Sequence, residues 1–368
     1  MRKKIKVAFI TNIIAPYRVG LFNKLEGSKV VDFKVFFERE GSAFRHWSID
    51  KSSIKFDYET LNTLILKMFK RSWISWNAIP RLSTYNPDIV VCGGYGLTFL
   101  QIFVWAYLFR KKIVLWGELT RQSESKRNFF QKLIRRCMAK IAAAAWAPSS
   151  ETRRYYESIG VKKIYVNLLT IDSLCVTKVS KKKYSEARKI NLLYVGRISR
   201  QKGIDKLIET YLLVRKNIKN ISLTLVGEPD SDKKFVDEMM SYNGRDGITF
   251  VSFTQNLDKI YKDASVFIFF TRQDTFGLVV SEALAYGLPV ICSKYAGCAE
   301  DLVKENGIVI NPDDVGGSAN KIRRFLADKR KLFSCGKRSI EIIKQELTDT
   351  SVRKLNEMFI HIVADKNE

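Results

Sequence analysis

The chain has 368 residues, 46% of them hydrophobic and 27% charged, which suits two domains of ordinary size and excludes a disordered, collagen-like or low-complexity protein. Its 63 Lys and Arg residues against 38 Asp and Glu residues give a formal net charge of +25. Such a charge favours polyanions, which include nucleic acid, anionic lipid headgroups and phosphorylated small molecules. A generally basic proteome is the plainer explanation, but the basic residues gather at 121–136 and 178–189.

Short apolar strands alternate with helices along the first half of the chain. This alternation is typical of parallel β-α-β units, in which an amphipathic helix follows each buried strand. The predicted strands are Val7–Ile10, Phe33–Phe37, Asp88–Cys92, Lys112–Trp116 and Ala144–Ala147, and helices are predicted near Val19–Leu25 and at Phe129–Ile141.

The same alternation restarts after a polar, basic stretch without periodicity at 172–189, which is the predicted linker. The predicted strands are Asn191–Val195, Ser222–Val226, Ile248–Phe250, Val266–Phe270, Pro289–Cys292 and Gly307–Ile310. Helices are predicted at Gly203–Asn217, Ser231–Tyr242, Leu257–Lys262 and Leu278–Tyr286, with three more after Ser318.

These patterns predict an α/β fold with two doubly wound, Rossmann-like domains that face each other across a cleft. The first domain is expected at 1–175 and the second at 190–349, with a C-terminal helix near 350–368 packing back on the first. In such sheets, ligands bind at the carboxyl ends of the strands.

The six cysteines show no metal-ligand spacing and are expected to be buried in a protein from a reducing compartment. The apolar run at 7–10 is too short for a signal peptide, and the run at 97–109 is shorter than the ~20 residues that a bilayer requires. We therefore expect a cytoplasmic protein without a spanning helix.

The segment 269–283 carries the strongest chemical signal. A strand ends there in a polar turn, and a helix is predicted to begin near Thr275 or Phe276. The first N–H groups of a helix lack internal partners and attract anions, so this turn predicts a phosphate site that Asp274 and Glu282 flank. The alternatives are that Asp274 only caps the helix and that Glu282 pairs with a lysine.

A second signal lies in the loop after the first strand of the second domain. Arg197 and Lys202 are five positions apart there, a spacing that allows two cations to hold a diphosphate and stabilise its developing charge. Alone, each would be an ordinary surface charge.

Together these residues resemble retaining glycosyltransferase family 4, which has the GT-B fold, most strongly over 192–312. The resemblance rests on an ordered set of motifs. Its elements are Gly196-Arg197, Lys202-Gly203, Asp274-Thr275-Phe276-Gly277-Leu278, Glu282-Ala283, Gly287-Leu288-Pro289, Ala296-Gly297, Asp301-Leu302-Val303 and Asn306-Gly307.

The resemblance implies a donor site for a nucleotide-diphosphate sugar in the second domain. Catalytic roles fall to Arg197, Lys202, Asp274 and Glu282, and donor contacts also to Gly196, Phe253, Phe276, Gly277 and Leu278. Asp274 stands where the family commonly has Glu, one methylene longer. No metal or other cofactor is implied, because the two cations and the helix start stabilise the leaving diphosphate.

The first domain is expected to bind the acceptor, and its loop Pro16-Tyr17-Arg18 is similar to that of a subset of bacterial surface-polysaccharide transferases. Tyr17 and Arg18 follow its first strand, Gly94 lies in a second loop, and Glu118 stands near the position where many family members have a histidine. A helix-start salt bridge at Arg18 and a structural role for Glu118 are equally open.

The acceptor is expected to be a saccharide, lipid-linked at the inner face of the cell membrane. Between Lys67 and Arg81, basic residues alternate with apolar ones without an acid, which suits an anionic membrane surface, although a core-facing helix is the alternative. An epimerase of the same fold is disfavoured because His46 and His361 are the only histidines. A nucleic-acid-binding protein is disfavoured because the chain has no zinc-ligand spacing, no RNA-recognition sequence and no Gly-rich basic tail. A catalytically silent partner subunit is disfavoured because both acids and both cations are present.

Overall fold

The computed structural model describes residues 3–41, 50–66, 72–125, 127–171, 189–252, 254 and 256–365. The chain divides into two compact units. Unit 1 contains residues 1–172 and 347–368, and unit 2 contains residues 173–346.

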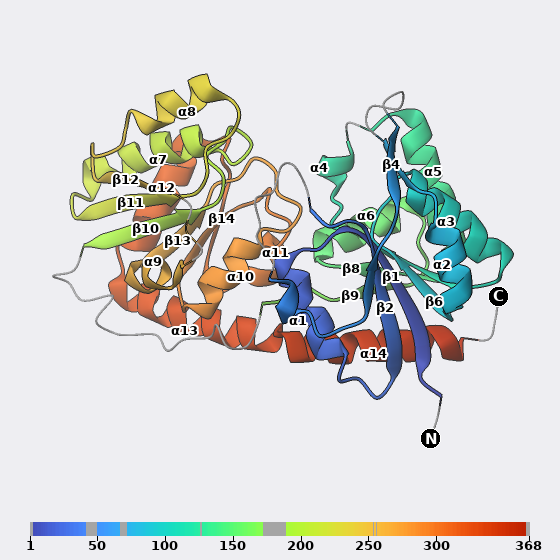
Figure 1. Ribbon diagram of the computed structural model, residues 1–368. Coiled ribbons are helices and arrows are strands. Elements are labelled where there is room, and N and C mark those ends of the chain that lie inside the picture. The colour runs from blue at the N-terminus through green and yellow to red at the C-terminus, as the bar shows by residue number, and fades with distance from the viewer. Residues whose placement is uncertain are drawn as a thin grey trace. The chain divides into compact units, whose positions relative to one another are not determined.

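Unit 1 is built on a seven-stranded parallel sheet in the order β3-β2-β1-β6-β7-β8-β9 (Figure 1). The central strands are apolar on both faces, as expected where helices cover both sides of a parallel sheet. The strands are β1 (Ile5–Ile13), β2 (Val31–Arg39), β3 (Tyr58–Thr60), β6 (Ile89–Cys92), β7 (Lys112–Trp116), β8 (Ala144–Ala147) and β9 (Ile164–Val166).

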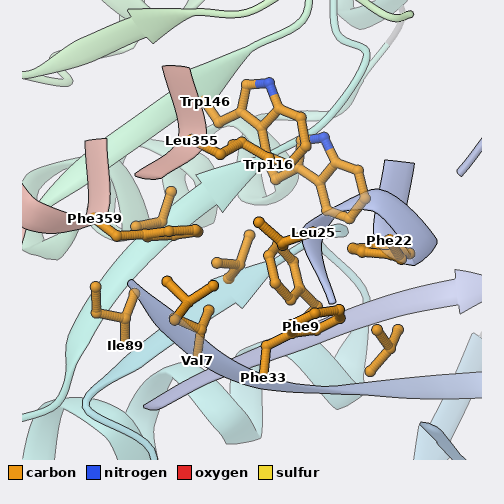
Figure 2. Close-up of a cluster of buried hydrophobic side chains, with 14 of the residues drawn as sticks. Val7, Phe9, Phe22, Leu25, Phe33, Ile89, Trp116, Trp146, Leu355 and Phe359 are labelled. Carbon is orange, nitrogen blue, oxygen red and sulfur yellow. The ribbon is translucent and has the colours of Figure 1, made fainter. Parts of the chain in front are cut away.

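Two groups of helices cover the two faces of this sheet. On one face, α1 (Pro16–Leu25) and α14 (Thr348–Ala364) enclose an aromatic core in which the Trp116 and Trp146 rings stack at 4.6 Å (Figure 2). On the other face lie α2 (Ala78–Tyr85), α3 (Leu97–Leu108), α5 (Phe129–Ile141) and α6 (Ser150–Ile159). The short elements are η1 (Lys51–Ser53), α4 (Arg121–Glu124) and a hairpin of β4 (Thr63–Leu66) and β5 (Ser72–Ser75).

Unit 2 is built on a six-stranded parallel sheet in the order β12-β11-β10-β13-β14-β15. Its strands are β10 (Ile190–Val195), β11 (Ile221–Val226), β12 (Ile248–Val251), β13 (Val266–Phe269), β14 (Val290–Ser293) and β15 (Gly307–Ile310). Its helices are α7 (Ile204–Asn217), α8 (Lys233–Met240), α9 (Asp258–Asp263), α10 (Leu278–Ala285), α11 (Ala299–Leu302), α12 (Val315–Leu326) and α13 (Lys329–Gln345).

The prediction of an α/β fold with two Rossmann-like halves is confirmed. Two local predictions differ from the structure. Of the two predicted starts of α10, Leu278 is confirmed and the start near Thr275 or Phe276 is wrong, because Gly277 adopts a left-handed conformation at the N-cap. In the basic stretch 67–81, residues 67–71 lie outside the described part; the rest forms strand β5 and the start of α2 rather than one amphipathic segment.

Candidate functional site

The loops after β10 and β13 lie side by side at the carboxyl edge of the unit 2 sheet, because the two strands are neighbours and parallel. The loops are joined by hydrogen bonds. The backbone N–H of Arg272 donates to the Gln201 carbonyl at 2.9 Å, and the Thr271 hydroxyl donates to the same oxygen at 3.3 Å. The backbone of each loop therefore fixes the position of the other.

An ion pair strengthens this junction. The Arg272 guanidinium donates two hydrogen bonds of 2.7 Å to the Asp205 carboxylate in the first turn of α7. Burial alone would raise the pKa of Asp205, but the hydrogen bonds and charge of Arg272 outweigh it and hold that pKa below its ordinary value. Planar, bidentate pairing gives the junction a defined geometry.

Gly277 is the N-cap residue of α10 and has a left-handed backbone conformation. Its φ of 96° is costly for any residue with a side chain, and a Cβ there would lie 2.9 Å from the Phe269 ring. The helix has no side-chain cap at this end. The first N–H groups of a helix have no partner within it, so this start offers the backbone donors that an anion site requires.

Lys202 and Asp274 meet at this helix start. Their side chains form a short ion pair and are largely buried, with 16% and 17% of each exposed. The other Asp274 oxygen accepts the backbone N–H of Phe276 at 3.0 Å. Asp274 thus caps the turn before α10 while it holds Lys202, so the capping role and the ion pair occur together.

Glu282 lies on the same helix, one turn further along. It accepts a hydrogen bond of 2.8 Å from the Tyr261 hydroxyl, and the Tyr261 ring stacks on Tyr286 at 4.9 Å. Within the described residues its other oxygen, Oε1, accepts no hydrogen bond, and no lysine pairs with it. Burial raises the pKa of Glu282 and the Tyr261 hydrogen bond lowers it, with a net rise.

The other predicted donor-binding residues make fewer contacts that point to a ligand site. Arg197 is exposed in the loop after Gly196 and has no ion-pair partner among the described residues, while its carbonyl accepts the Tyr194 hydroxyl at 2.9 Å. Phe276 is buried, and Leu278 is the first residue of α10. Phe253 lies outside the described residues.

A second cluster lies at the carboxyl edge of the unit 1 sheet. Glu118 accepts hydrogen bonds from the Tyr17 hydroxyl at 3.0 Å and from Arg18 at 3.3 Å. Arg18 also donates to the Thr11 hydroxyl, and its guanidinium lies 4.3 Å from the centre of the Trp116 ring. The structure thus brings together three of the four predicted acceptor residues. It also gives Arg18 the salt bridge that was the alternative interpretation.

Gly94, the fourth of these residues, lies in the loop after β6, the strand between β1 and β7. A Cβ at Gly94 would lie 2.4 Å from the Phe99 ring, so close packing against α3 explains the glycine without any ligand.

Sequence reasoning did not single out Tyr261, Asp205 or Arg272 for a role. Arg272 stands inside the segment 269–283, next to the residues that were chosen, and could have been found there. Tyr261 carries no comparable signal, since its hydroxyl meets Glu282 only after α9 and α10 pack together.

Two Rossmann-like units with this edge geometry define the GT-B class of fold. A crystal structure of HepE from Anabaena in complex with UDP superposes with a TM-score of 0.76 and 17% identity, over 97% of this chain and 100% of that one. At this identity, the likeness establishes the fold alone.

The similarity to known families lies in the sequence of unit 2. Residues 176–341 match the family model described as Glycosyl transferases group 1. An uncharacterized glycosyltransferase of Methanocaldococcus jannaschii is 34% identical over 37% of this chain. A capsular polysaccharide biosynthesis glycosyltransferase of Staphylococcus aureus is 27% identical over 37% of it. The match spans 36% of each of these two relatives.

Proposed function

We propose that the protein is a retaining glycosyltransferase of family 4 that moves a sugar from a nucleotide-diphosphate sugar to a saccharide acceptor. The observation that carries this proposal is the Lys202–Asp274 pair at the uncapped start of α10. A cation, open backbone N–H groups and a carboxylate at one point match the three parts of a sugar diphosphate that need recognition: phosphate charge, phosphate oxygens and sugar hydroxyls.

In this proposal Lys202 binds the diphosphate and keeps Asp274 close to the sugar. An ammonium group has three N–H donors, so Lys202 can hold Asp274 and a phosphate oxygen together. Arg197 is exposed and free of an ion-pair partner among the described residues, which suits a side chain that closes on the second phosphate. Glu282 offers Oε1 to the ribose hydroxyls while Tyr261 holds Oε2.

The proposed chemistry breaks the bond between the anomeric carbon and the diphosphate. Positive charge develops on the sugar and negative charge on the leaving phosphate, which Lys202, Arg197 and the start of α10 stabilise. The acceptor hydroxyl attacks from the same face, and the leaving phosphate accepts its proton, so configuration is retained. In this scheme no metal ion is required.

A panel of nucleotide sugars, screened by thermal shift, tests the donor assignment. A donor at 100 times its dissociation constant should stabilise the protein by roughly 2.7 kcal/mol. The matching sugar should then be transferred in the presence of EDTA with retention of the anomeric configuration, which NMR of the product reads directly. Inverted product, or failure of every nucleotide sugar to stabilise the protein, would overturn the proposal.

We further propose a lipid-linked acceptor, used in bacterial cell-surface polysaccharide or glycoconjugate synthesis at the inner face of the membrane. Among the described residues, no helix is long and apolar enough to cross a bilayer. Access to such an acceptor would then rest on peripheral binding, for which the charge of +25 is suited. The acceptor would meet the Tyr17, Arg18 and Glu118 cluster of unit 1.

A further inference from the structure

The outer side of α5 combines exposed apolar rings with uncompensated positive charge. Phe129 and Phe130 at the start of the helix are 71% and 72% exposed, and Leu133 is 45% exposed. Soluble proteins rarely expose contiguous apolar patches, and such patches commonly mark an interaction surface. These residues begin the helix and are not needed for its core contacts, which Met138 and Ala139 make.

The basic residues of α5 form a stripe beside the apolar one. Lys132, Arg136 and Lys140 are exposed and spaced four apart, so they lie along one side of the helix. Phe129 and Leu133 form the adjoining stripe. Arg135 points the other way, buried in an ion pair of 2.5 Å with Glu124. α5 itself contains no acid, so the charge of its outer face is not compensated within the helix.

A second helix on the same sheet face adds exposed apolar residues, although it contains no basic residue of its own. α3 exposes Val104, Tyr107 and Leu108 by 52%, 62% and 69%, and exposed Phe109 and Arg110 follow directly. Both helices pack inward on one hydrophobic cluster, so both turn their outer sides to the same side of unit 1 (Figure 1).

We propose that the outer face of α5, continued by the end of α3, is the surface by which this protein docks on an anionic lipid bilayer. The Phe129, Phe130 and Leu133 side chains enter the headgroup boundary, and Lys132, Arg136 and Lys140 meet lipid phosphates. The proposal rests on the proposed function only in taking the acceptor to be lipid-borne. It assigns the docking surface to residues outside both candidate ligand clusters.

A second copy of the chain fits this face less well. In a two-fold interface the same patch meets itself, which would bring three cations of one α5 toward three of the other. Lysine is also depleted in the buried centre of protein interfaces. An anionic bilayer satisfies both the apolar and the basic stripe.

Vesicle flotation of the full-length protein tests the proposal, with phosphatidylglycerol-rich and pure phosphatidylcholine vesicles at low salt. Wild-type protein should float with the anionic vesicles and stay behind with the neutral ones. Each basic residue near an anionic surface contributes about fivefold in partition, so Lys132→Gln, Arg136→Gln and Lys140→Gln together should lower binding roughly a hundredfold. The pair Phe129→Gln and Phe130→Gln should weaken binding at any salt concentration.

Matched controls remove equal charge or equal apolar surface elsewhere. The charge control neutralises three exposed lysines of unit 2: Lys216→Gln, Lys219→Gln and Lys234→Gln. The apolar control makes two exposed residues of α14 polar: Ile360→Gln and Val363→Gln. Vesicle binding should be retained in both. Thermal melts of every variant exclude misfolding, and thermal shift by a nucleotide sugar reports the donor site separately. Loss of donor binding with intact flotation would refute the proposed function and leave this inference standing.

Three results would overturn the proposal. The first is wild-type protein that does not bind anionic vesicles, and the second is α5 variants that bind them as tightly as wild type. The third is a wild-type dimer in light scattering that becomes a monomer in the α5 variants, without any vesicle binding, because a second copy would then cover this face.

Discussion

The carboxyl edges of the two sheets use similar residues in different ways. In unit 2, Lys202 meets Asp274 beside a helix that begins at Gly277 with open backbone N–H groups. In unit 1, Arg18 meets Glu118 beside α1, which has Pro16 in its first turn and so lacks one of those N–H groups. Arg18 is also stacked on Trp116.

Because of this difference, the carboxyl edge of the unit 2 sheet can attract an anion better than that of the unit 1 sheet. Both cations pair with a carboxylate and lie over an aromatic ring. The cation of unit 2 also stands at a helix start that keeps its backbone donors, whereas the cation of unit 1 donates to a further hydroxyl beside a helix whose first turn contains proline. We therefore expect phosphate recognition in unit 2 and hydroxyl recognition, through Glu118 and Tyr17, in unit 1.

Lys202→Ala should have the largest effect. Removing the cation takes away charge stabilisation of the leaving diphosphate and leaves Asp274 largely buried without its partner, so kcat/KM should fall about 100- to 1,000-fold. Steady-state kinetics measure this loss. Lys206→Ala, which breaks only an exposed pair with Glu209, should have near-normal kinetics. Equal losses in the two variants would contradict the division.

Glu282→Gln should weaken donor binding by about 10- to 100-fold, since a charged acceptor of hydrogen bonds is replaced by a neutral one. Isothermal titration with the donor measures the change. Tyr261→Phe is the matched variant, because it removes the hydroxyl that holds Glu282 and keeps the ring. Its effect on donor affinity should be smaller.

The same Glu282→Gln variant should be more stable than wild type at neutral pH. Because the pKa of Glu282 is raised above its ordinary 4.5, the folded state holds that proton more tightly than the unfolded state does. The contribution of Glu282 to the wild-type free energy of unfolding is therefore fully present below pH 4.5 and is lost as the pH rises through the raised pKa. The variant's advantage in denaturant unfolding should grow over that window. An advantage that shrinks with rising pH would contradict burial as the cause.

Arg272→Ala should have an intermediate effect. It removes the bidentate pair with Asp205 that joins the two unit 2 loops, so the donor KM should rise several-fold while stability falls by about 1 kcal/mol. Arg338→Ala on α13, which also breaks ion pairs, is the control for stability and should leave the donor KM unchanged.

Glu118→Gln should have the smallest effect and should affect the acceptor alone. A neutral amide in this position can still accept from Tyr17, so a rise of a few-fold in acceptor KM is expected, with donor binding unchanged. Kinetics at saturating donor measure the rise. A large loss of kcat instead would give Glu118 a direct part in the chemistry.

Much of unit 2 could be predicted from sequence because its signals are local. An apolar run fixes a buried strand, and Gly277 followed by an apolar helix fixes an open helix start. The short strands β3 and β9 were missed because three residues carry too little periodicity, and their positions depend on pairing with β2 and β8. The apolar periodicity placed the α10 start correctly at Leu278, whereas the polar turn suggested a start two or three residues earlier, which the left-handed Gly277 prevents.

The sequence by itself determined the α/β class, the two-fold repetition of the fold and the residues that stand at strand ends, since each depends on neighbours in the chain. Only the tertiary structure decided which side chains meet. Tyr261 reaches Glu282 across 21 positions, Arg272 reaches Asp205 across 67 and Arg18 reaches Glu118 across 100. Contacts of that kind depend on how helices pack on a sheet, and spacing along the chain does not encode that geometry.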